Sequence, residues 1–148
     1  MKKGLAAARW IDLAVRADPR GTLTIAGYDE IPFSIARLFY VRDVPSGTER
    51  GGHAHRVTEQ FVVAVNGTLS FDLTDGRDNR SFHLDSPTRG AYIPPMLWDR
   101  FCDFSEHAVC LVLASTQYAE SDYVRDWSEY QRLTGSTGDA PVAAKRFK

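Results

Sequence analysis

Turn-forming residues interrupt this 148-residue chain at short intervals, and this spacing leaves room mainly for short elements. The interruptions are pairs or triplets that contain Gly, Pro, Asn or Asp, and they fall at Pro19–Gly21, Pro45–Gly47, Gly51–Gly52, Asn66–Gly67, Asp75–Gly76 and Pro94–Pro95. The segments between them are rich in Val, Ile, Phe, Tyr and Leu, a composition typical of strands. Strands this many and this short close best into a sandwich or small barrel. The sequence therefore predicts an all-β fold.

Two of these strands are predicted to form a hairpin. Residues 61–65 and 69–73 flank Asn66-Gly67, and Asn-Gly tolerates the positive φ angles that a tight type I′ turn requires. Further strands are predicted from the apolar segments 35–44, 81–84, 91–93 and 109–114. The last of these is almost continuously apolar, which predicts a position covered on both faces.

A single helix is predicted near the C-terminus, where it would pack against the barrel. Ser121 can cap it, and Gly135 can end it. Between these two residues, apolar side chains recur at helical spacing, at Val124, Trp127 and Tyr130. The chain then becomes rich in small and polar residues, so residues 135–148 are predicted to form a flexible tail. The sequence therefore predicts one domain, formed by residues 1–134.

Composition excludes several classes of protein. The formal net charge of −1 gives no basic field for nucleic acid or an anionic membrane. No apolar run approaches the roughly 18 residues of a membrane span, and the first apolar segment is too short for a signal peptide. The two cysteines, Cys102 and Cys110, form no CxxC motif, which argues against a disulfide scaffold or structural zinc. We therefore expect a cytoplasmic protein.

The chemistry-bearing residues are concentrated in a short segment that contains two histidines. His53 and His55 lie two residues apart, so on a strand they project from the same face, with their Cα atoms roughly 6.5–7 Å apart. Gly51 and Gly52 precede them and let a ligand approach the backbone closely. Because the pKa of histidine lies near 6.5, such a pair suits either proton transfer or metal binding.

The spacing around the pair favours one metal hypothesis. Gly47, His53, His55, Glu59 and Gly67 follow the first sequence motif of the cupin superfamily, whose two histidines and glutamate often bind a divalent metal. Two histidines and one carboxylate suffice to hold iron as a facial triad.

The second cupin motif is incomplete, because residues 94–100 contain neither the expected glycine nor the histidine. The alternative is metal-free chemistry, in which the imidazoles remove and return a proton. Arg50 fits this alternative, since a guanidinium makes paired hydrogen bonds with phosphate oxygens. Arg37 would join it at the mouth of the barrel.

Motifs spread over roughly residues 10–133 resemble those of the nucleotide-sugar 3,4-ketoisomerase family. They comprise Ile31–Phe33, Arg37–Tyr40, Arg50–His55 with Glu59-Gln60, Asp75-Gly76, Tyr92–Pro95 with Trp98, Asp103-Phe104, Leu113–Ser115 with Tyr118, and Asp122–Arg125. The resemblance implies a cupin-type antiparallel β-barrel, or jelly roll, that works as a homodimer without metal or cofactor. It implies conversion of a dTDP-4-keto-6-deoxyhexose into its 3-keto isomer, a step toward deoxyamino sugars.

The same resemblance assigns roles to individual residues. His53 and His55 become the catalytic pair that moves a proton through an enediol. Arg50 and Arg37 would lie near the diphosphate of the nucleotide sugar. Gln60 and Trp98 would line the pocket.

Three further residues are predicted to contact the sugar. Phe39 stands where many relatives have tyrosine, and Asp99 follows the tryptophan where relatives often have histidine or arginine. If Asp99 and Arg20 touch the sugar near C4, they affect which face receives the proton. The configuration of the product at C4 therefore stays open.

Two other functions remain as alternatives. One is a metal-dependent cupin, an oxygenase or isomerase, that uses His53, His55 and Glu59. The other is a non-catalytic sugar-nucleotide-binding cupin, an alternative that the departures at Phe39 and Asp99 keep open.

Overall fold

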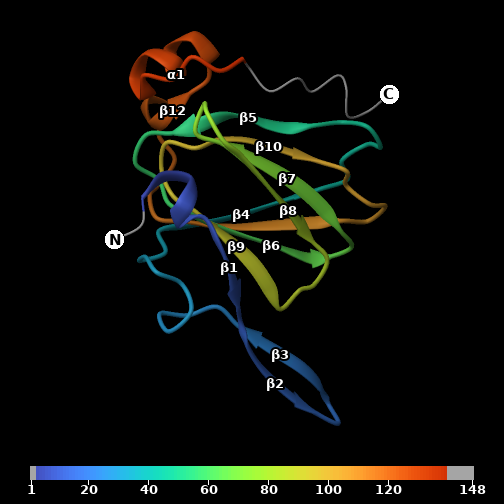
Figure 1. Ribbon diagram of the computed structural model, residues 1–148. Coiled ribbons are helices and arrows are strands. Elements are labelled where there is room, and N and C mark those ends of the chain that lie inside the picture. Colours follow the sequence, from blue (N-terminus) through green and yellow to red (C-terminus); the bar gives the residue numbers. More distant parts are fainter. Residues whose placement is uncertain (1–2, 140–148) are drawn as a thin grey trace.

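Two antiparallel five-stranded sheets close into a barrel in the computed structural model, which describes residues 3–139 (Figure 1). The first sheet contains, in spatial order, β1 (Arg9–Asp12), β9 (Arg89–Ile93), β6 (Gln60–Asn66), β11 (Val109–Ala114) and β4 (Arg37–Arg42). The second contains β12 (Tyr123–Val124), β5 (Arg50–His55), β10 (Trp98–Cys102), β7 (Leu69–Thr74) and β8 (Asn79–Leu84). The predicted all-β barrel is confirmed.

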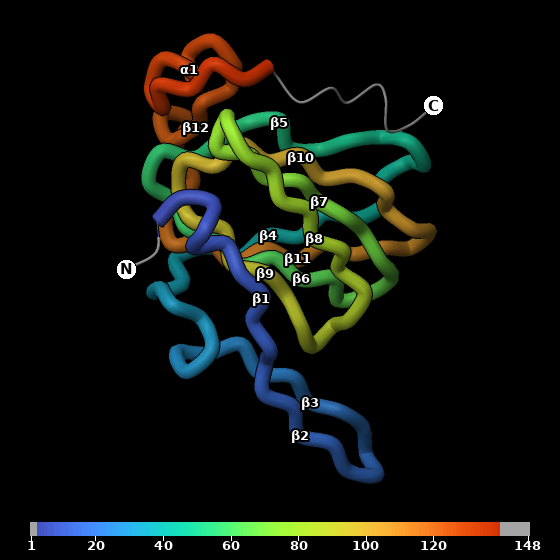
Figure 2. Tube along the Cα trace, viewed as in Figure 1, coloured from blue at the N-terminus to red at the C-terminus, as the bar shows by residue number. Residues whose placement is uncertain are grey.

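Three other kinds of element complete the described part of the chain. Strands β2 (Ala14–Asp18) and β3 (Gly21–Ile25) form a separate hairpin, and helix α1 spans Trp127–Thr134. Two short 3₁₀ turns, η1 (Gly4–Ala7) and η2 (Glu120–Asp122), precede β1 and β12. The hairpin and α1 lie at opposite ends of the molecule, as the trace in Figure 2 shows. None of the helices within residues 3–139 is long and apolar enough to cross a membrane.

The barrel is filled by side chains that alternate along the strands. Leu69, Phe71 and Leu73 of β7 are all buried and point to the same side of the sheet. The ring of Phe71 stacks on those of Phe82 and Phe101, each with a centroid distance of 5.0 Å. Aromatic pairs of this kind add to the free energy gained by burying their area.

The predicted hairpin at Asn66-Gly67 is wrong. Strands β6 and β7 flank this turn, but β6 pairs with β9 and β11, whereas β7 pairs with β8 and β10. The turn therefore carries the chain from one sheet to the other. Its polar groups bind a neighbouring loop, because Thr68 N–H donates to Ser105 Oγ and Asn66 Nδ2 donates to the His107 carbonyl. Asn-Gly favours a tight turn, but it does not determine which strands pair.

Helix α1 begins later than the sequence predicts. Asp126 caps it by accepting a hydrogen bond from Glu129 N–H, and Gly135 ends it in the left-handed conformation, with φ of 68°. The predicted end is confirmed, but the predicted cap at Ser121 is wrong. Val124, which the helical spacing included, lies instead in β12, where it pairs with β5. Strand pairing here overrides the helical period.

The helix packs on the outer face of the second sheet. Tyr130 is fully buried, and its hydroxyl donates to the carbonyls of Thr74 and Met96. The first residues of the predicted tail contact the helix, because the Gly138 carbonyl accepts hydrogen bonds from Trp127 and Gln131. The flexibility of residues 135–148 stays a prediction. Residues 140–148 of that predicted tail lie outside the described residues.

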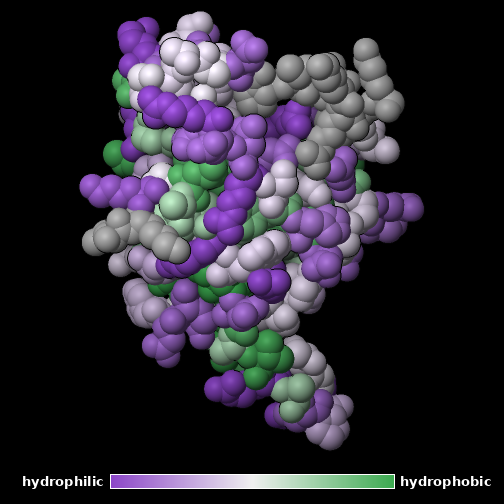
Figure 3. Space-filling model, viewed as in Figure 1, coloured by the Kyte–Doolittle hydropathy of each residue, from purple (hydrophilic) through white to green (hydrophobic). Residues whose placement is uncertain are grey.

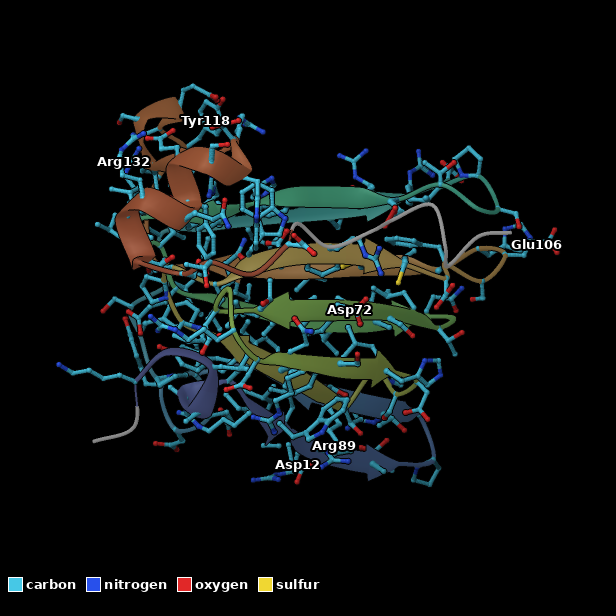
Figure 4. All side chains as sticks on the ribbon, turned by 45° about the horizontal axis from the view of Figure 1, so that its top comes forward. Asp12, Asp72, Arg89, Glu106, Tyr118 and Arg132 are labelled. Atoms are coloured by element: carbon cyan, nitrogen blue, oxygen red, sulfur yellow. The ribbon has the colours of Figure 1, made fainter. Side chains whose placement is uncertain are left out.

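Strand β1 attaches the N-terminal segment to the barrel. It pairs with β9, and Asp12 and Arg89 from these two strands lie side by side in Figure 4, with 3.4 Å between Oδ1 and Nε. The β2–β3 hairpin follows and projects from the barrel (Figure 1). Apolar side chains remain exposed on it, at Val15, Leu23 and Ile25. Figure 3 shows hydrophobic side chains gathered on the hairpin, where it leaves the barrel.

Candidate active site

The two histidines lie side by side on one face of β5, as their spacing predicts. Their ring centroids are 5.1 Å apart, and both rings line the same cavity. Ala54 between them points to the opposite face, where it is buried with residues of α1. One face of β5 therefore lines the cavity, and the other packs against the helix.

The strands on either side of β5 each place one residue directly opposite a histidine. Asp99 of β10 pairs with His53, and Tyr123 of β12 pairs with His55. Cross-strand partners share a face of the sheet. A bulge between Asp99 and Arg100 interrupts the register, a feature that often redirects a side chain beside an active site.

The cavity has a volume of about 250 Å³ and two kinds of wall. The apolar wall consists of Phe39, Val41, Phe101, Phe104, Cys110 and Val112. The polar wall consists of Arg50, Gly51, His53, His55, Gln60, Asp99, Tyr123 and Arg125. An apolar space with a few convergent polar groups is typical of a small-molecule site.

A buried carboxylate orients His55. Nδ1 of His55 lies 2.8 Å from Oδ2 of Asp122, and the Val57 N–H and Thr58 hydroxyl donate to the same carboxylate. Burial alone would raise the pKa of Asp122, but these hydrogen bonds outweigh it and lower the pKa below its usual value. Because a carboxylate can only accept, Nδ1 of His55 must donate. The lone pair of Nε2 is then available as a base.

Both imidazoles are neutral at pH 7. Burial lowers the pKa of His55, although Asp122 opposes this shift. Burial, the neighbouring His55 and the positive charge of Arg125 lower the pKa of His53 to about 4. Tyr123 packs against both rings at centroid distances of 4.9 and 4.5 Å, and the guanidinium of Arg125 lies over the Tyr123 ring. A neutral imidazole is the form that can accept a proton.

Asp99 is an unusual carboxyl group for such a cavity. It is 2% exposed, and burial raises its pKa to about 8, although the Gly52 N–H opposes the shift. Its Oδ2 lies 3.9 Å from Nε2 of His53. The backbone fits around it only because residue 51 is glycine: a Cβ there would collide with the carboxyl group, and φ is 83°. Gly51, the first residue of the glycine pair, thus makes room for Asp99.

Comparisons with known proteins identify this arrangement. The family described as "FdtA: WxcM-like, C-terminal" matches residues 6–135. The chain belongs to this FdtA family. It is 40% identical over 116 residues to the TDP-4-oxo-6-deoxy-alpha-D-glucose-3,4-oxoisomerase of Aneurinibacillus thermoaerophilus, which covers 78% of this chain and 84% of that protein.

Solved structures of related proteins share the fold. A 3,4-ketoisomerase from Helicobacter canadensis matches with a TM-score of 0.84 and 34% identity, covering 88% of this chain and 98% of that one. A mutant of the 3,4-ketoisomerase QdtA from Thermoanaerobacterium thermosaccharolyticum, in complex with TDP-4-keto-6-deoxyglucose, gives the same score and identity over 88% and 96%. The predicted cupin-type fold is confirmed.

The structure brings together most of the residues predicted for this FdtA-family site. Phe39, Arg50, Gln60 and Asp99 line the cavity with the two histidines. Arg37 does not line the cavity, but its guanidinium lies over the rings of Phe39 and Tyr118, with 5.4 and 5.8 Å to their centroids. The predicted roles of these residues toward substrate remain predictions.

Two predicted site residues lie elsewhere. Trp98 packs against Trp127 and Tyr130 on the outer face of the second sheet, so the prediction that it lines the pocket is wrong. It adjoins Asp99 in β10, and neighbouring residues of a strand point to opposite faces. Arg20 lies in the β2–β3 turn, where it forms an ion pair with Asp18. Arg20 is not among the residues of this chain that line the cavity.

Glu59 does not join the histidines, which contradicts the predicted metal triad. Its carboxylate accepts a hydrogen bond of 2.6 Å from the Tyr92 hydroxyl and does not line the cavity. Within residues 3–139, His53, His55 and Asp99 form the one acidic or imidazole cluster tight enough for a shared cation, with nitrogen and oxygen atoms within 4.8 Å of one another. The same spacing also allows all three to contact one substrate.

Three residues of the site had no assigned role in the sequence. Asp122, Tyr123 and Arg125 belong to a motif that carried the family resemblance, but their segment was interpreted as helix. In β12 and its flanks the side chains instead alternate, so Tyr123 and Arg125 line the cavity while Val124 is buried in the cluster beneath α1. The sequence did contain a signal for a strand here, because Tyr and Val, the residues at positions 123 and 124, both favour strands.

The buried carboxyl group predicts a pH-dependent effect of Asp99→Asn on stability. Between about pH 4 and pH 8, folded Asp99 keeps a proton that the unfolded chain, with a pKa near 3.8, has lost. Asp99 therefore destabilises the fold increasingly as the pH rises through this range. The D99N variant should gain stability relative to the unmodified protein from pH 5 to pH 8, measured by urea unfolding.

Asp85→Asn on the exposed surface is the matched control and should show no such trend. A stability difference between D99N and the unmodified protein that stays constant or shrinks with rising pH would contradict the burial argument.

Proposed function

We propose that this chain is a sugar 3,4-ketoisomerase that converts a TDP-4-keto-6-deoxyhexose into its 3-keto isomer, through a domain formed by residues 1–134. The relative at 40% identity is named for this reaction on TDP-4-oxo-6-deoxyglucose. A structural neighbour at 34% identity binds TDP-4-keto-6-deoxyglucose. The observation that carries the proposal is the neutral His55, held by Asp122 with its free nitrogen available to the cavity.

The chemistry follows from this geometry. A ketone at C4 acidifies the hydrogen on C3, so a neutral imidazole can remove it as a proton. The resulting enediol is planar at both carbons, and the same imidazolium can return the proton to C4. Hydrogen-bond donors around the cavity stabilise the developing negative charge on oxygen. The reaction moves hydrogen within the sugar and needs no external oxidant.

Three arginines in the wall of the cavity or close to it support a diphosphate ligand. Arg50 lines the cavity but is exposed, and Arg125 is about half exposed. The Nε atom of Arg37 is buried and makes no hydrogen bond within the described residues. Guanidinium groups bind phosphate oxygens in pairs. We assign Arg50 and Arg37 to the diphosphate, with Gln60 and Phe39 against the sugar.

The proposal includes a homodimer in the cytoplasm. Leu38 and Tyr40 are 55% and 61% exposed on β4, an edge strand whose outer side pairs with no other described strand. Exposed apolar side chains and an open edge are features of interfaces. Both cysteines are free, as in a reducing compartment.

Sedimentation should give twice the chain mass, and a monomer at micromolar concentration would contradict the dimer.

His55→Asn tests the catalytic assignment. Incubation with TDP-4-keto-6-deoxyglucose in deuterated water, followed by NMR, should show a 3-keto product with deuterium at C4 for the unmodified protein. Loss of the base should reduce turnover by about 10²–10⁴-fold in H55N. His53→Asn should also reduce turnover.

His107→Asn is the matched control, because His107 is exposed and is not among the residues that line the cavity. Turnover by H55N at the rate of H107N would overturn the role of His55. Binding without turnover by the unmodified protein would favour the non-catalytic sugar-nucleotide-binding function.

A metal-dependent cupin remains the second candidate because His53, His55 and Asp99 cluster so closely. Proton transfer by imidazole predicts that dialysis against a chelator leaves turnover unchanged. Elemental analysis of the dialysed protein accompanies the assay. Lost activity that returns with iron, manganese or nickel would favour the metal-dependent function instead.

A further inference from the structure

Several polar atoms inside the cavity are buried but make no hydrogen bond to the described residues. They are His53 Nδ1, Gln60 Oε1 and Asp99 Oδ1, and their three side chains line the same cavity. A buried polar atom without a partner is unfavourable, so such atoms are rare away from functional sites. Three of them in one cavity indicate a ligand with several polar groups.

Asp99 and His53 are placed to share one oxygen of that ligand. Asp99 Oδ2 and His53 Nε2 are 3.9 Å apart, which is too far for a direct hydrogen bond. An oxygen atom about 2.8 Å from each of them fits between the two. The two groups face each other as a cross-strand pair of β5 and β10, so the gap is set by the sheet.

The proposed reaction requires two separate proton movements. One hydrogen moves from C3 to C4, and His55 with Asp122 accounts for it. The second proton leaves the hydroxyl on C3 and arrives on the oxygen at C4, because the product has its ketone at C3 and its hydroxyl at C4. This second movement needs a group that can both donate and accept a proton between the two oxygens.

We propose that Asp99 is the catalytic residue that carries the hydroxyl proton between the two sugar oxygens, while His53 binds one of these oxygens. This assignment rests on the proposed ketoisomerase function. Under this assignment, the site has a second acid–base residue in addition to His55.

The steps balance without any other reactant. In the first step, Nε2 of His55 takes the C3 proton, the C3–H electron pair forms the C3–C4 double bond, and the C4 oxygen takes a proton from Asp99. In the second step, the Asp99 carboxylate takes the proton from the C3 hydroxyl, the C3 ketone forms, and His55 returns its proton to C4. Both residues then regain their starting protonation states.

The surroundings of Asp99 suit this role. Other charged or titratable side chains that line the cavity are Arg50, His53, His55, Cys110, Tyr123 and Arg125. The two arginines belong to the exposed part of its wall, and both imidazoles are neutral at pH 7. Burial raises the pKa of Asp99 to about 8, so its carboxyl group starts protonated at neutral pH. A carboxylic acid in that state can donate first and accept second.

Asp99→Asn separates the two proton movements. An amide keeps the size of the side chain but cannot take up or release the proton. In deuterated water with TDP-4-keto-6-deoxyglucose, D99N should still exchange the C3 hydrogen for deuterium in the recovered substrate, because His55 still removes it and the amide N–H can still donate a hydrogen bond to the enolate oxygen at C4. Formation of the 3-keto product should fall by about 10²-fold, so the ratio of isomerisation to exchange should fall at least about tenfold.

Binding of TDP to D99N, measured by calorimetry, shows that the variant is folded, and Asp99→Ser replaces it if TDP does not bind. Asp85→Asn is the control and should keep the unmodified ratio. An unchanged ratio in D99N, or equal loss of exchange and isomerisation, would overturn the assignment of Asp99. Absence of the 3-keto product with the unmodified enzyme would instead overturn the proposed function itself.

Discussion

The hydrogen bond from His55 to the Asp122 carboxylate determines which ring nitrogen can act on a substrate. Asp122 lies at the end of the 3₁₀ turn η2, and the pairing of β12 with β5 brings it against His55. The Val57 N–H and the Thr58 hydroxyl keep the carboxylate ionised and fixed. Without this carboxylate, the buried imidazole would have neither a defined tautomer nor a defined orientation. The pairing of the two-residue edge strand β12 therefore determines which nitrogen of His55 can act as the base.

In the second sheet, side chains alternate between the face toward the cavity and the face beneath α1. His53, His55 and Asp99 face the cavity, while Ala54, Trp98 and Val124 are buried on the opposite face beneath α1. Each catalytic candidate is thus a strand neighbour of a packed apolar residue. This arrangement fixes the reacting side chains through the rigidity of the sheet rather than through loops. The helix acts as the support of the site although none of its residues lines the cavity.

Local sequence patterns predicted the all-β fold and the shared face of His53 and His55, because both depend on the period of a strand. They failed where long-range pairing decides the outcome. Asn66-Gly67 predicted a turn correctly but the wrong strand pairing, and the helical spacing at Val124 gave way to pairing with β5. The errors at Trp98 and Glu59 have different causes. Trp98 adjoins Asp99 in β10 and therefore points to the opposite face, whereas Glu59 lies outside the strands, between β5 and β6, where the period of a strand does not place its side chain.

The protonation of His55 tests this account most directly. Nitrogen-15 NMR of the protein with labelled histidine distinguishes the two neutral tautomers from the imidazolium ion. The account predicts a neutral ring at pH 7, with the proton on Nδ1 and none on Nε2. A proton on Nε2, or a doubly protonated ring at pH 7, would contradict it.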